Sequence, residues 1–101
     1  MKIVVFSAPE DEAPGLVRTL VEERLVACGN VFGPVRSIYR WEQRVLDETE
    51  AVVLMETWED RAQTAVRRLG ELHSYEVPKI LVLDPESVPS SYAKWVELVT
   101  R

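Results

Sequence analysis

Histidine, the side chain that most often binds metals and transfers protons near neutral pH, occurs once in this chain, as His73. It lies in the segment ELHSYEVPKI, residues 71–80, where a helical apolar pattern gives way to a strand-like one. Imidazole nitrogen is a ligand of copper(II) and thiolate sulfur of copper(I), so Cys28, the only cysteine, is a second candidate ligand. The carboxylate of Glu76 adds an oxygen. His73, Glu76 and Cys28 are therefore the candidate metal ligands, with copper or another divalent cation as the candidate ion.

The single histidine and the single cysteine each also have a structural interpretation. A histidine at the C-terminal end of a helix is favoured by the helix dipole and can hydrogen-bond the last carbonyls, which suits His73. A free cysteine often behaves as a small buried hydrophobe, which suits Cys28. The sequence leaves both interpretations open, because it does not give the separation of the two side chains.

Several classes of function are not indicated. No Ser–His–Asp order, glycine-rich phosphate loop, HExxH or CxxC pattern is present, so we do not expect an enzyme. A net charge of −5 without a cluster of Lys and Arg argues against nucleic acid as a partner. The longest apolar run near the start, residues 3–6, is too short for a signal peptide or membrane span, and one cysteine suits a reducing compartment. We expect a cytoplasmic protein.

The elements that must position these residues can be read from hydrophobic periodicity. The pattern predicts one domain of 101 residues with the order β-α-β-β-α-β-α. Its first six elements form the split βαβ, or ferredoxin-like, pattern of an α+β fold, with both long helices on one face of an antiparallel sheet. The expected strands are residues 2–7, 35–41, 44–58 and 79–83, and the expected helices are residues 13–25, 62–72 and 90–99. In the last helix, Tyr92 and Trp95 are expected in the core.

The central pair of strands predicts a long β-hairpin that turns at Glu42 and Gln43. Residues 44–58 would span roughly 50 Å at about 3.3 Å each. A domain of this size has a radius of gyration of about 13 Å, so the tip should project beyond the core. The tip is too apolar to stay in water and its edges are unpaired, which predicts an interface between subunits. The interface residues we expect are Ile38, Tyr39, Trp41, Val45 and Leu46.

Three segments together resemble the CutA divalent-cation tolerance protein family. They read TLVEERLVACGN at residues 19–30, SIYRWEQRV at residues 37–45 and ELHSYEVPKI at residues 71–80, and Tyr92 with Trp95 gives a matching Tyr-x-x-Trp. The resemblance implies a ferredoxin-like subunit in a homotrimer similar to PII-like signalling proteins, joined through the long hairpins. It also implies a role in tolerance to copper and other divalent cations, as a scaffold or in signalling.

The resemblance has two further implications. In such a trimer, Tyr39 and Trp41 could meet Tyr75 and Glu76 in an intersubunit cleft that admits a small ligand, and three copies of His73 could gather near the axis. Departures from the family pattern weaken the metal interpretation, since copper-binding members carry Cys and His at places that here hold Phe6 and Leu72. Other departures are Gln43, Glu56, Ser74 and the Leu-Asp-Pro at residues 83–85.

Overall fold

The elements follow the predicted order in the computed structural model, which describes all residues from 1 to 101. Their bounds are β1 Lys2–Ala8, α1 Ala13–Glu22, β2 Cys28–Trp41, β3 Arg44–Thr57, a short 3-10 helix Glu59–Arg61, α2 Ala62–Leu72, β4 Ile80–Leu83 and α3 Ser90–Val99. None of the helices has the length and apolar character needed to cross a membrane.

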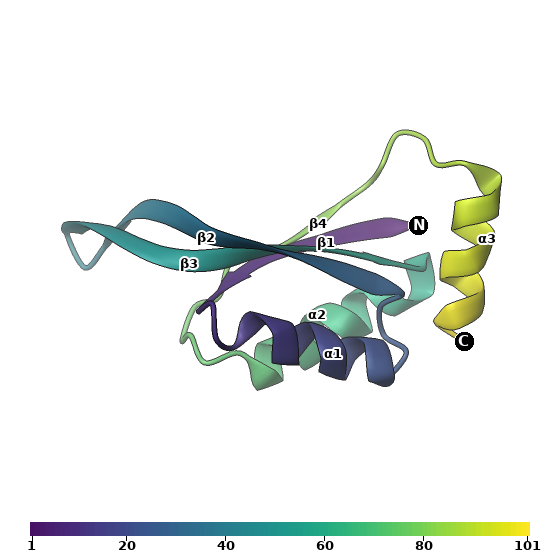
Figure 1. Ribbon diagram of the computed structural model, residues 1–101, viewed down its shortest axis with the longest axis horizontal. Coiled ribbons are helices and arrows are strands. Elements are labelled where there is room, and N and C mark those ends of the chain that lie inside the picture. The colour runs from purple at the N-terminus through teal and green to yellow at the C-terminus, as the bar shows by residue number, and fades with distance from the viewer.

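The four strands form one antiparallel sheet in the order β2-β3-β1-β4. Helices α1 and α2 lie side by side beneath one face of this sheet, whereas α3 stands at the end of the sheet near the N-terminus (Figure 1). The predicted α+β, ferredoxin-like architecture is therefore confirmed.

The core lies between the sheet and the two long helices. It is built from residues two apart on the strands and three or four apart on the helices, as the two backbone periodicities require. Its fully buried members include Val4, Phe6, Ala8, Ala51, Val53, Met55, Leu20, Ala65 and Leu69.

Helix α1 ends three residues earlier than its periodicity predicts. Arg24 has a left-handed φ of 61°, and the N–H of Leu25 donates to the carbonyl of Leu20 at 2.9 Å. The N–H of Arg24 donates to Val21 at 3.0 Å, which completes a Schellman motif. Leu25 therefore keeps its place in the core but lies in the turn after the helix.

Strand β2 begins at Cys28, seven residues before the predicted start at Val35. Gly33 and Pro34 do not end the strand, because the register passes from Phe32↔Val52 to Val35↔Glu50 with one extra residue on β2. This β-bulge absorbs the two residues that resemble a bend in the sequence. Beyond it, odd-numbered residues of β2 share a face with even-numbered residues of β3.

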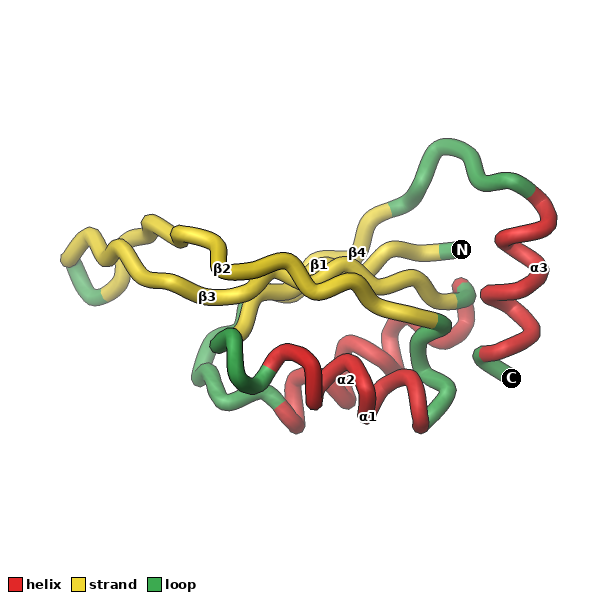
Figure 2. The backbone as a smooth tube through the Cα atoms, viewed as in Figure 1, coloured by secondary structure: helices red, strands yellow, loops and turns green.

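The β2–β3 hairpin projects beyond the rest of the domain, as the strand length predicts (Figures 1 and 2). The molecule measures 45 × 26 × 21 Å, and its radius of gyration is 14.1 Å. Strand β1 pairs with β3 only over residues 51–57, so residues 44–50 have β2 as their sole neighbour. The predicted two-residue turn is present, with φ of 49° at Glu42 and 68° at Gln43.

The expectation that Tyr92 and Trp95 lie in the core is wrong, because both rings are exposed. Helix α3 touches the end of the sheet instead of covering a face, so it buries only a narrow stripe that contains Val96. Its end is held by Arg61, whose Nε donates to the carbonyl of Thr100 at 2.7 Å.

Candidate functional site

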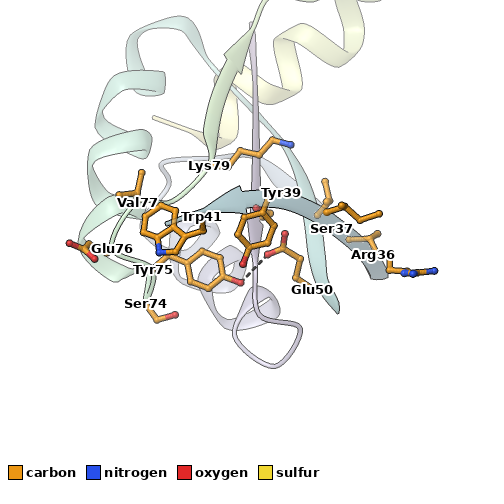
Figure 3. A pocket seen from close by; sticks show the side chains of 14 residues that line it. Arg36, Ser37, Tyr39, Trp41, Glu50, Ser74, Tyr75, Glu76, Val77 and Lys79 are labelled. Atoms are coloured by element: carbon orange, nitrogen blue, oxygen red, sulfur yellow. Dashed lines mark hydrogen bonds between the residues drawn. The ribbon is translucent and has the colours of Figure 1, made fainter. Parts of the chain in front are cut away.

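A cavity of about 840 Å³ opens beside the projecting half of the hairpin (Figure 3). It lies between the outer part of β2, the adjoining residues of β1 and β3, and the loop that leads from α2 to β4. The residues that matter for its chemistry are Tyr39, Trp41, Glu50, Tyr75, Glu76 and Lys79. All four predicted cleft residues, Tyr39, Trp41, Tyr75 and Glu76, therefore line one cavity of a single chain.

The sheet register explains how the strand residues come to this place. Tyr39 pairs with Leu46 and Trp41 with Arg44, so both rings share a face of the hairpin with Glu48 and Glu50. This is the face opposite α1 and α2, since the helix-facing residues of β3 carry odd numbers.

Tyr75 reaches the same place from the loop after α2, and that loop is fixed by His73. The imidazole Nδ1 of His73 accepts the backbone N–H of Tyr75 at 3.1 Å. Because Nδ1 is an acceptor, Nε2 carries the proton and donates to the carbonyl of Ser7 at 2.7 Å. The ring is only 8% exposed and meets Phe6 edge to face at 6.1 Å between centroids. Both ring nitrogens of His73 are thus occupied within the chain.

Two tyrosines that line this cavity bind carboxylates through their hydroxyls, and of the two carboxylates Glu50 also lines it. The hydroxyl of Tyr75 donates to Glu50 at 2.9 Å, along the dashed line in Figure 3, and that of Tyr39 donates to Glu48. Burial, and then the hydrogen bond to Glu50, raises the pKa of Tyr75, and the hydrogen bond to Glu48 raises the pKa of Tyr39. Both hydroxyls therefore remain protonated donors at neutral pH.

Sequence reasoning did not select Glu48 or Glu50 as functional residues. The signal was present, because counting outward from the turn at Glu42 and Gln43 pairs Glu48 with Ser37 and Glu50 with Val35. Both carboxylates then fall on the face of Tyr39. What the sequence could not give is the loop that brings Tyr75 against this face.

The predicted metal ligands are not brought together. Cys28 pairs with Glu56 at the opposite end of the hairpin from the turn, whereas His73 contacts Ser7 and Glu76 lines the cavity. Within the chain, no group of three or more His, Cys, Asp or Glu side chains is placed to hold a metal ion. The residues of one subunit therefore do not fit a copper centre.

Cys28 belongs to a small polar cluster beneath α3. Its Sγ donates to Glu56 at 3.0 Å and lies 3.3 Å from the hydroxyl of Tyr92, which also donates to Glu56 at 2.9 Å. Burial, and then Glu56, raises the pKa of the Cys28 thiol. The thiol is half-buried and stays protonated at neutral pH, which makes it a poor metal ligand and nucleophile.

Comparisons with known proteins agree with one another. The family described as CutA1 divalent ion tolerance protein matches residues 2–98. The chain is 36% identical over 97 residues to the divalent-cation tolerance protein CutA of Pyrococcus horikoshii, covering 95% of this chain and 94% of that one. The corresponding protein of Thermus thermophilus is 33% identical over 96 residues, with 94% and 93% covered. Among solved structures, a PII-like protein CutA from Nostoc sp. PCC 7120 superposes with a TM-score of 0.95 at 33% identity, covering 100% of this chain and 98% of that one.

Proposed function

Because the chain belongs to the CutA1 divalent ion tolerance family, we propose that it acts in divalent-cation tolerance as a homotrimer joined through its projecting hairpins. The observation that carries this proposal is the unpaired overhang of the sheet. Residues 44–50 of β3 have no strand on the edge away from β2, so their outward N–H and C=O groups lack sheet partners.

The side chains of the overhang support the same conclusion. Ile38 is 65% exposed and Val45 is 62% exposed, and both lie in the part of the hairpin that β1 does not reach. Apolar side chains of this size on a two-stranded ribbon are stabilised when a neighbour covers them. Three subunits, as opposed to two, are favoured by the PII-like description of the similar Nostoc protein and by the implied family assembly.

We propose a scaffold or signalling role for this trimer and no catalytic one. A metal role for His73 would require its ring to release either Ser7 from Nε2 or Tyr75 from Nδ1, even where three copies meet. We therefore assign no copper-binding step to His73, Glu76 or Cys28 of one subunit. The cytoplasmic location expected from the sequence stays a prediction.

The hairpin interface can be tested with a charge-matched double variant. Ile38 lies opposite Asp47 and Val45 lies opposite Arg40, so Ile38→Lys and Val45→Glu each gain an oppositely charged cross-strand neighbour. The variant keeps the hairpin of one subunit while placing charges on the surface that would be buried. We expect the molar mass from light scattering to be about three times that of one chain for the unchanged protein, and equal to that of one chain for the variant.

The control is Val21→Lys, which replaces an exposed valine on α1 that borders the inner part of β2 at Val31 and not the projecting half of the hairpin, and it should leave the trimer intact. A wild-type protein that is a folded monomer at micromolar concentration would refute the proposal. So would a double variant that still assembles as trimers.

The cavity supports a second candidate function, the sensing of a small molecule. Its volume lies within the range of about 300–1,000 Å³ typical of ligand pockets, and a few polar groups converge on it. A thermal-shift panel of metal ions and nucleotides separates the two candidates, since a metal-only response favours the first and a response to an organic compound the second.

A further inference from the structure

Three aromatic rings in the cavity remain open to solvent. Tyr39 is 40% exposed, Trp41 is 41% exposed and Tyr75 is 38% exposed, and Figure 3 shows them as one group on the cavity wall. None of the three stacks on either of the others. The faces of Tyr39 and Trp41 are therefore free to meet a ligand, and so is the side of Tyr75 turned away from His73, whose ring centroid lies 4.7 Å from that of Tyr75. Such faces attract cations within about 6 Å of the ring centre.

The same group carries negative charge that no cation of the chain neutralises. Glu48 and Glu50 each accept a tyrosine hydroxyl, but neither has a Lys or Arg within ion-pair distance, and the same holds for Glu76. In each hydrogen-bonded carboxylate the second oxygen remains free to accept.

The two cations that line the cavity do not oppose this charge at the rings. Arg36 is held by Asp47, with Nε–Oδ1 and NH2–Oδ2 distances of 3.0 and 2.7 Å. Figure 3 shows the Arg36 side chain pointing away from the three rings and Lys79 extending away from Trp41 and Tyr75. The aromatic part of the cavity therefore has the character of a cation site.

A bare metal ion does not suit this arrangement. Hard divalent cations need six or more converging oxygens and copper favours nitrogen or sulfur, whereas no group of three metal-binding side chains is present. The wide cavity and the aromatic walls suit a large, weakly hydrated cation.

We infer that this cavity binds an organic cation, a small molecule whose alkylated ammonium group contacts Tyr39, Trp41 and Tyr75. Its charge is neutralised by Glu50, which lines the cavity, and by Glu48, which accepts the hydroxyl of Tyr39. The inference rests on the second candidate function, the sensing of a small molecule, and names its ligand class. In the assembled trimer a neighbouring subunit would border the cavity, so the intact assembly must be used to test it.

Choline and its uncharged analogue of the same shape, 3,3-dimethylbutan-1-ol, serve as probes. Each is titrated into the assembled protein to about 50 mM, a range suited to weak aromatic cation sites. The indole N–H resonances are followed by NMR. We expect choline to shift the signal of Trp41 in a saturable way and to leave Trp95, which lies on α3, unchanged. The uncharged analogue should not bind in this range.

Two variants of Tyr75 separate the ring from the hydroxyl. Tyr75→Leu removes the ring and should weaken choline binding about tenfold, whereas Tyr75→Phe keeps it and should weaken binding by less than about threefold. Glu50→Gln keeps the shape and should weaken binding by about fivefold. Lys79→Met removes a positive charge and should leave binding equal or tighter.

The outcomes that overturn the inference are distinct. Equal binding of the uncharged analogue would show an apolar pocket without charge selection. Weaker choline binding in Lys79→Met would contradict the electrostatic explanation, and a response of Trp41 to Cu²⁺ or Mg²⁺ but not to choline would show a metal site. Light scattering on the same samples keeps the tests apart, because an intact trimer that ignores choline refutes only this inference. A wild-type single subunit refutes the trimer.

Discussion

His73 has a structural task that its position explains. Strand β1 continues to Ala8, but its pairing with β4 stops at Phe6 and Ile80. The carbonyl of Ser7 lies one residue beyond that pairing and accepts a hydrogen bond from the Nε2–H of His73. The imidazole thus continues the edge of β4 by one hydrogen bond and, through Nδ1, fixes the loop that carries Tyr75.

We predict that His73→Ala lowers the free energy of unfolding by about 2–3 kcal/mol, because it leaves a buried carbonyl unsatisfied and a gap beside Phe6. Denaturant unfolding measures the change. Ser74→Ala is the control, since Ser74 hydrogen-bonds Glu12 at the surface and should cost less than about 1 kcal/mol. A fully stable His73→Ala protein that has lost copper binding would reverse this assignment.

Cys28 should react slowly with alkylating agents. Burial and the Glu56 carboxylate raise its pKa, so at pH 8 to 9 less thiolate is present than in a free cysteine. Glu56→Gln removes one of the two causes and should speed the reaction with iodoacetamide. An unchanged or slower rate in Glu56→Gln would contradict this explanation.

The sign of the linked stability follows from the direction of the shift. The folded state holds the Cys28 proton more tightly than the unfolded state does. This tighter binding of the proton adds to the free energy of unfolding. The added stability is complete at pH values below the pKa that the thiol has in the unfolded chain, and it is lost as the pH rises through the higher pKa of the folded protein.

Most of the helices and strands could be predicted, because the hydrophobic pattern of each segment agrees with the face that it buries in the folded protein. The alternation of β1 and β3 and the stripes of α1 and α2 all point at one core, and the Glu42-Gln43 turn sets the hairpin register. The errors occur where local sequence is ambiguous. Gly33-Pro34 resembles the end of a strand, and only the neighbouring strand β3 shows that it is a bulge.

Gly29 marks a close approach between elements that gives a sharp test. A Cβ there would lie 2.6 Å from a methyl carbon of Val17 on α1 and 3.1 Å from the side chain of Met55. Gly29→Ala should therefore destabilise the fold by about 1–3 kcal/mol. Gly70→Ala is the matched control, since nothing lies within 4 Å in α2, and it should stabilise by about 0.5–1 kcal/mol. Equal effects measured by thermal unfolding would contradict this packing.

In the proposed trimer, the thermal stability of the protein depends on the protein concentration. If the overhang is covered only by other subunits, the thermal midpoint should fall by roughly 4 °C for each tenfold dilution. The Ile38→Lys, Val45→Glu variant should show no such dependence. Differential scanning measurements at three protein concentrations test this, and a constant midpoint for the unchanged protein would argue against coupled folding and assembly.

The cavity shows why a site is harder to predict than a fold. The residues Tyr39, Trp41, Tyr75 and Glu76 were recognisable as cleft candidates from the resemblance. The neighbouring carboxylates became significant only when the α2–β4 loop was seen to reach the outer hairpin, a long-range contact that no local pattern encodes.

The extra residue in β2 also has a genetic consequence. Removing one codon at Gly33 or Pro34 would take out the extra residue and let the ladder run from Phe32↔Val52 to Val35↔Glu50 without interruption. Because the pairing beyond Val35 is set from the turn at Glu42 and Gln43, Tyr39 and Trp41 would keep their partners and their face. The gene could thus lose three bases at the bulge and still present the same aromatic wall to the cavity.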